Sequence, residues 1–72
     1  MRGITERQAW TLRWIDGYIR SAGFPPTVRE IARALGGVSS NAGKDVLAVL
    51  AGKGYVQVTP NVARGIRILR MP

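Results

Sequence analysis

The 72-residue sequence predicts a mainly α-helical fold that ends in a small β-hairpin. Two capping-box patterns, Thr5-Glu6-Arg7-Gln8 and Thr27-Val28-Arg29-Glu30, each open a segment with apolar residues at helical spacing. From Tyr55 onward the apolar residues alternate with polar ones, which is the period of a strand. A chain this short buries only about 60–65% of its unfolded surface, so we expect one domain over residues 1–72 with a modest core.

The first helix is predicted over residues 6–22. Thr5 is its N-cap and Gln8 reaches back to complete the capping box, while Gly23 ends the helix. The predicted core stripe follows one helical face and consists of Leu12, Ile15, Ile19 and Ala22.

The second helix is predicted to begin after Thr27, with Glu30 as the capping partner. The preceding Phe24-Pro25-Pro26 segment cannot be helical, because each proline disfavours the α conformation in the residue before it. This helix is expected to bury Val28, Ile31 and Leu35 and to stop at Gly36-Gly37.

The third helix is predicted over residues 40–51, with Ser39 as its N-cap and Gly54 after its end. Its core face is predicted to be Val46, Leu47 and Leu50. Residues 55–59 then alternate as a strand, Ile66 and Ile68 repeat the pattern, and residues 60–63 form the loop between them. Three helices followed by such a hairpin are typical of a winged helix-turn-helix.

The charge of the chain indicates a polyanionic partner. Eleven basic residues and four acidic ones give a net charge of +7 and a pI of about 11.5, which favours nucleic acid over an anionic membrane surface. The sequence has no cysteine and no histidine, which excludes disulfides and cysteine zinc sites and removes the usual general base. We therefore expect no enzyme, no metal and no cofactor. The sequence has no apolar run of membrane-spanning length, so we expect a cytoplasmic protein.

The third helix carries the candidate base-reading residues. The second helix of a helix-turn-helix enters the major groove with its N-terminal residues against the base edges. Asn41 can pair with adenine, Lys44 can donate to guanine and Asp45 can accept from cytosine. Ala42 can contact a thymine methyl group, and Ser39 lies within reach of a base or a phosphate. The alternative is that Ser39 only caps the helix and the others form an ordinary solvated face.

Gly43 is unusual inside a helix, because glycine costs about 1 kcal/mol there relative to alanine. It either lets the backbone approach DNA closely or occupies an exposed turn where glycine is tolerated.

A second set of residues is predicted to contact phosphates or the minor groove, because arginines in a hairpin wing suit both contacts. Each of these residues is also explained by solvation, by helix capping or, for Lys53, by the helix dipole. The set consists of Arg7, Thr27, Arg29, Lys53, Arg64 and Arg67.

Trp10 and Trp14 stand four residues apart, close to the opposite side of the first helix from its predicted core stripe. At least Trp10 should therefore be exposed, and tryptophan is enriched at protein interfaces. We expect the pair to bind a partner protein or a second copy; the alternative is packing against the chain ends near Met71 and Pro72.

Several motifs together resemble the N-terminal DNA-binding domain of the LexA repressor family, regulators of the bacterial SOS response. The two most specific are Gly23-x-Pro25-Pro26-Thr27-x-x-Glu30-Ile31-Ala32 and Arg64-Gly65-Ile66-Arg67-x-Leu69. The others are Ile4-Thr5-x-Arg7-Gln8, Leu35-Gly36, Ser39-x-Asn41-Ala42, Leu47-x-x-Leu50 and Lys53-Gly54.

The resemblance implies a winged helix-turn-helix that binds a palindromic operator as a dimer and blocks transcription. It also implies that bases are read at the positions of Ser39, Asn41, Ala42, Lys44 and Asp45. Lys44 departs from the acidic residue of enterobacterial members, so the operator sequence does not carry over. The family's repressors continue into a self-cleaving dimerisation domain that this sequence lacks. The sequence is either an excised fragment or a stand-alone gene product, and we expect a natural small protein, for example of a phage or plasmid.

The sequence thus favours a sequence-specific regulator of transcription, most simply a repressor, that binds double-stranded DNA. Two alternatives stay open. One is an excisionase-like or architectural DNA-binding factor of a mobile element. The other is an interaction module that binds a host regulator through Trp10 and Trp14. Besides double-stranded DNA, the expected partner is a second copy, in a weak homodimer on DNA, or a host protein.

Overall fold

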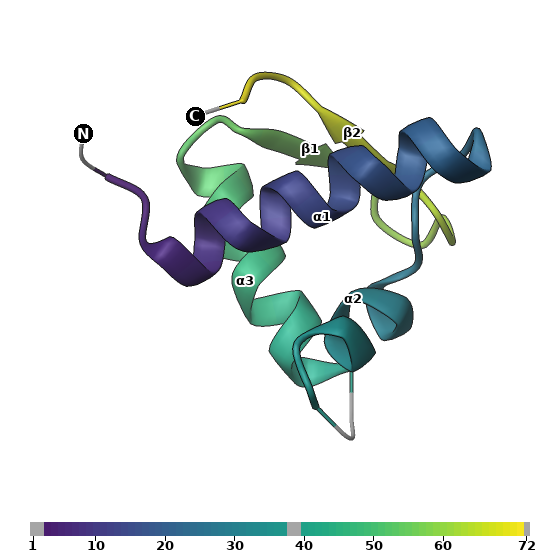
Figure 1. Ribbon diagram of the computed structural model, residues 1–72, viewed down its shortest axis with the longest axis horizontal. Coiled ribbons are helices and arrows are strands. Elements are labelled where there is room, and N and C mark those ends of the chain that lie inside the picture. The colour runs from purple at the N-terminus through teal and green to yellow at the C-terminus, as the bar shows by residue number, and fades with distance from the viewer. Residues whose placement is uncertain (1–2, 38–39, 72) are drawn as a thin grey trace.

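The winged helix-turn-helix predicted from the sequence is the fold that the computed structural model shows (Figure 1). The structure describes residues 3–37 and 40–71. Within these ranges, three helices precede a two-stranded antiparallel hairpin. The elements are α1 (Glu6–Ala22), α2 (Val28–Ala34), α3 (Asn41–Gly52), β1 (Val56–Val58) and β2 (Ile66–Ile68).

The capping signals of α1 are confirmed. The Gln8 backbone N–H donates to Thr5 Oγ1 (3.2 Å), and the Thr5 backbone N–H donates to Gln8 Oε1 (3.0 Å). Gly23 adopts a φ of 85° and donates its N–H to the Ile19 carbonyl, which ends the helix.

The core stripe of α1 is confirmed except at its C-terminal end. Leu12 and Ile15 are fully buried and Ile19 packs partly buried against the core. The prediction for Ala22 is wrong, since this residue is exposed. It lies in the last turn of α1, which extends beyond α3 (Figure 1).

The second helix also begins with a capping box. The Glu30 backbone N–H donates to Thr27 Oγ1 (3.1 Å), and the Thr27 backbone N–H donates to Glu30 Oε1 (2.8 Å). Ile31 is fully buried as predicted, whereas Val28 and Leu35 are only partly buried against the core.

The third helix begins at Asn41, one residue later than predicted, and Ser40 occupies its N-cap position. Ser39, which the sequence analysis placed there, lies outside the described residues. The predicted core face of Val46, Leu47 and Leu50 is buried.

Gly43 is where α3 packs most closely on α2. A Cβ atom at this position would lie 2.6 Å from the Val28 carbonyl oxygen and 3.2 Å from the Ala32 backbone nitrogen. Gly43 is also buried. Both sequence interpretations of this glycine are therefore wrong: it is needed for helix packing inside the protein.

The hairpin pairs Val56 with Ile68 and Val58 with Ile66. The first strand, Val56–Val58, is shorter than the predicted residues 55–59. Hydrogen bonds from the Leu69 N–H to the Tyr55 carbonyl (2.8 Å) and from the Thr59 N–H to the Gly65 carbonyl (2.8 Å) continue the same register at its two ends. Buried residues of all three helices and both strands form one core: Leu12, Ile15, Ile31, Val46, Leu47, Leu50, Tyr55, Val56 and Ile66. None of the helices described is long and apolar enough to cross a membrane.

Replacing Gly43 with alanine should lower the free energy of unfolding by about 1–3 kcal/mol, because the added methyl group overpacks the contact with α2. Gly17→Ala is the matched control, since Gly17 lies inside α1 with no atom within 4 Å of an added Cβ. That variant should be neutral or more stable by up to about 1 kcal/mol. Urea denaturation followed by circular dichroism measures both, and a Gly43→Ala protein as stable as wild type would contradict the packing argument.

Candidate nucleic-acid interface

The predicted base-reading residues gather on the outer side of the first two turns of α3. Asn41, Lys44 and Asp45 are exposed and Ala42 is partly buried. They face away from the side of the helix that buries Gly43, Val46 and Leu47. The structure thus brings four of the five predicted positions together, and Ser39 lies outside the described residues.

The predicted phosphate-contacting residues divide into two groups. Arg7 on α1, Arg29 on α2 and Arg67 on β2 are exposed. The remaining three, Thr27, Lys53 and Arg64, make contacts within the protein, and only the capping contact of Thr27 was predicted from the sequence.

Thr27 and Lys53 both stabilise helix ends. The Thr27 hydroxyl accepts a hydrogen bond in the α2 capping box. The Lys53 ammonium group, just after α3, donates to Gln8 Oε1 (3.0 Å) at the start of α1. Gln8 is itself part of the α1 capping box, so Lys53 joins the two helices.

Arg64, in the loop between the strands, makes the largest set of internal contacts in the described part of the wing. Its Nη1 donates to Glu30 Oε1 (2.9 Å) and the Pro25 carbonyl (2.9 Å), and its Nη2 donates to Glu30 Oε2 (3.4 Å). Nη1 also lies 3.3 Å from the Tyr18 hydroxyl, and the guanidinium carbon lies 4.7 Å from the centre of the Phe24 ring. We call this group, Arg64 with Tyr18, Phe24, Pro25 and Glu30, the Arg64 network.

The Arg64 network holds Glu30 in its charged form. The hydrogen bond from the Thr27 backbone, followed by the one from Arg64, lowers the pKa of Glu30 to about 2. Hydrogen bonds with Tyr18 and then Glu30 raise the pKa of Arg64 above its ordinary value. The ion pair is therefore fully charged at neutral pH.

A cleft separates α3 from the outer part of the hairpin. It has a volume of about 350 Å³ and is mainly apolar. It begins beside Lys44 and ends at Val58 and Pro60, where β1 leads into the wing loop. The wing loop is thus not packed directly on the candidate base-reading helix there.

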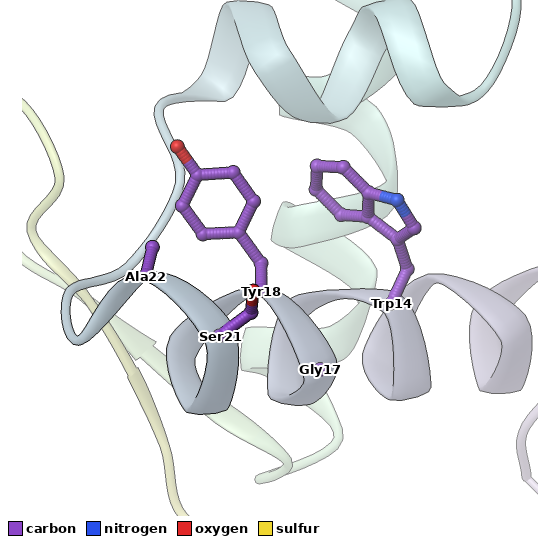
Figure 2. Close-up of a pocket in the computed structure, with 5 residues that line it drawn as sticks. All are labelled: Trp14, Gly17, Tyr18, Ser21 and Ala22. Atoms are coloured by element: carbon purple, nitrogen blue, oxygen red, sulfur yellow. The ribbon is translucent and has the colours of Figure 1, made fainter.

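Trp10 is 42% exposed, as predicted, whereas Trp14 packs partly buried against the core. The Trp14 ring lies 5.5 Å from that of Tyr18. Beside these rings is an open groove of about 370 Å³ on α1, shown in Figure 2. Both rings project from the same side of the helix, with Gly17 between them. Met71 is exposed and Pro72 lies outside the described residues.

Within residues 3–37 and 40–71, no three His, Cys, Asp or Glu residues come together as metal ligands would.

Replacing Glu30 with glutamine should flatten the dependence of stability on pH in the acid range. Because the pKa of Glu30 is lowered in the folded protein, its contribution is complete above the unfolded value of about 4.5 and disappears as the pH falls towards 2. Thermal melting measured from pH 7 to pH 2 should show a larger decrease in melting temperature for wild type than for Glu30→Gln. Equal losses in the two proteins would contradict the assigned ion pair.

Comparison with known proteins identifies the family. The LexA DNA binding domain family matches residues 1–65. The LexA repressor of Pseudomonas aeruginosa is 47% identical over 68 residues, which cover 94% of this chain and 33% of that protein. The LexA repressor of Cellvibrio japonicus is 43% identical over 68 residues (94% of this chain, 34% of that protein). The chain thus spans about a third of the length of these relatives. It belongs to the LexA DNA-binding domain family.

Proposed function

We propose that this protein is a sequence-specific regulator of transcription that binds double-stranded DNA and acts as a repressor. The observation that carries the proposal is the exposed polar face at the start of α3, formed by Asn41, Lys44 and Asp45. A winged helix-turn-helix of the LexA DNA-binding domain family presents this face, and the chain carries a net charge of +7. The relatives described above are named as repressors, which supports the direction of regulation.

In this proposal, α3 lies in the major groove with its N-terminal half against the bases. Asn41 pairs with adenine, Lys44 donates to a guanine and Asp45 accepts from a cytosine amino group. Ala42 contacts a thymine methyl group, and Ser39 is the fifth residue proposed to reach a base or a phosphate. Repression follows because a protein bound to its operator excludes the transcription machinery from the same DNA.

Backbone contacts then orient the protein on the duplex without reading its sequence. The exposed Arg7, Arg29 and Arg67 are the first candidates. Thr27, Lys53 and Arg64 remain in the proposed set, although each makes internal contacts. We further propose that residues 1–72 act as one domain in the cytoplasm, on the bacterial nucleoid, without catalysis, metal or cofactor.

The departure at Lys44 makes the operator the first thing to determine. Selection from a random duplex library identifies the preferred site, and a LexA-type palindrome is tested in parallel for comparison. Fluorescence polarisation then compares that site with a scrambled duplex at two salt concentrations. A preference of a hundredfold or more that persists at high salt supports sequence reading, whereas equal binding that fades with salt contradicts it.

Asn41→Ala should weaken binding to the selected site by about 1–3 kcal/mol and leave binding to the scrambled duplex nearly unchanged, because only a base contact is lost. Arg67→Ala is the matched control. It should weaken both duplexes alike and make the log–log salt slope shallower by about 0.9, as expected for one phosphate contact. If the two variants behave alike on both duplexes, the division into base-reading and backbone-contacting residues is wrong.

The exposed Trp10 and the groove beside Trp14 favour a second activity, contact with another protein. We propose that this surface supports weak pairing of two copies on a palindromic operator, with a host regulator as the alternative partner. Trp10→Ala should then reduce the cooperativity of binding to a full palindrome and leave half-site binding unchanged. Leu69→Ala, an exposed apolar residue after β2, is the control. Equal cooperativity in both variants would contradict a role for this surface.

A further inference from the structure

We propose that Glu30 and Arg64 are a positioning pair for DNA binding: they fix the wing against the helix-turn-helix and so set where the wing lies relative to α3. This inference rests on the proposed function, because its consequence is measured on DNA. It also gives Arg64 a role other than the phosphate contact expected from the sequence. Neither residue needs to touch DNA in this role.

The paired strands attach the wing to the core at both of their ends. Val56 is buried near α3, and Ile66, which pairs with Val58 next to the loop, is buried as well. Beyond the strands, residues 59–63 of the loop are exposed, and the cleft of about 350 Å³ lies between Pro60 and α3. The strands therefore hold the base of the wing, whereas the loop beyond them has little packing of its own.

Arg64 supplies a second attachment, at the outer end of the wing. Its guanidinium group holds both oxygens of Glu30, a residue 34 positions away, and also the Pro25 carbonyl. The ring of Phe24 covers one side of the group. Figure 1 shows the wing loop beside the segment that joins α1 to α2, and this segment contains Phe24 and Pro25. A planar guanidinium group with two bonds to one carboxylate fixes orientation as well as distance.

The backbone conformation of the wing loop directs Arg64 towards these partners. Arg64 has a φ of 59°, an uncommon conformation for a residue with a side chain. Gly65 follows, and a Cβ there would lie 2.9 Å from the Val62 carbonyl oxygen. The loop is closed by hydrogen bonds from Thr59 N–H to the Gly65 carbonyl (2.8 Å) and from Gly65 N–H to the Val62 carbonyl (3.1 Å).

Helix α2 links this attachment to the base-reading helix. The Glu30 carboxylate that binds Arg64 also accepts the Thr27 N–H and so caps α2. Helix α2 in turn contacts α3 at closest range around Gly43. One continuous path of contacts therefore runs from the wing loop through α2 to α3, and it ties the place of the loop to that of the base-reading helix.

Removing the charge of Glu30 separates positioning from direct contact. If Arg64 only contacts phosphate, Glu30 is a competing negative charge, and Glu30→Gln should tighten binding to every duplex. If the pair positions the wing, Glu30→Gln should weaken binding to the selected operator even though a negative charge has been removed. The sign of the change distinguishes the two roles.

The experiment is a double-mutant cycle of Glu30→Gln, Arg64→Gln and the double variant, measured by fluorescence polarisation on the selected operator and the scrambled duplex. Each single variant should weaken operator binding by about 3- to 30-fold, and the double variant should bind no more weakly than the weaker single variant. Glu30→Gln combined with Arg7→Gln is the matched control and should be additive, because Arg7 lies on α1, outside the wing and the Arg64 network. Circular dichroism at the assay temperature ensures that every variant compared is folded.

Two further readouts exclude a general loss of structure. Hydroxyl-radical footprinting of the operator DNA should show that Glu30→Gln no longer protects the nucleotides next to the wing. The same variant should still protect the nucleotides around α3. Arg64→Lys keeps the charge but not the two-pronged geometry, so it should bind like Arg64→Gln. A variant that is folded but loosened overall would lose protection at both places.

Tighter or unchanged operator binding by Glu30→Gln would overturn the proposal, as would additivity of Glu30→Gln with Arg64→Gln or wild-type binding by Arg64→Lys. Failure of the proposed function is a different result: the wild-type protein would then not distinguish the selected operator from the scrambled duplex.

Discussion

The Glu30 carboxylate receives hydrogen bonds from three parts of the chain that are far apart in sequence. They come from the Thr27 N–H at the start of α2, the Tyr18 hydroxyl on α1 and the Arg64 guanidinium group in the wing. The position of α2 and that of the wing both depend on this one acceptor. Because the group stays charged well into the acid range, the arrangement is maintained across all physiological pH values.

The helix-turn-helix itself depends on a steric constraint at Gly43. The backbone of α2 comes so close to α3 that no side chain fits between them. Gly43 lies on the same side of α3 as the buried Val46, Leu47 and Leu50, and the opposite side carries the exposed Asn41, Lys44 and Asp45. The close contact with α2 is thus part of the packing face of the helix, and the wing has its separate attachment through Arg64.

Local signals in the sequence predicted most of the fold, because they act over three or four residues. Both capping boxes, the helix end at Gly23 and the strand alternation were confirmed. The predictions that failed depend on distant contacts. Ala22 fits the helical stripe but lies beyond α3, and the need for glycine at position 43 comes from another helix. The Arg64 network was missed because no periodicity relates residues 30 and 64, although an arginine in a hairpin loop was itself noticed.

The position of Gly43 also affects how the specificity of this domain can change. It is a fixed position between Ala42 and Lys44, inside the stretch proposed to read bases. The neighbouring positions 41, 44 and 45 are exposed, whereas Ala42 is partly buried. A library aimed at new operators should therefore randomise positions 41, 44 and 45, restrict position 42 to small side chains and keep glycine at 43. New recognition would then arise on an unchanged scaffold.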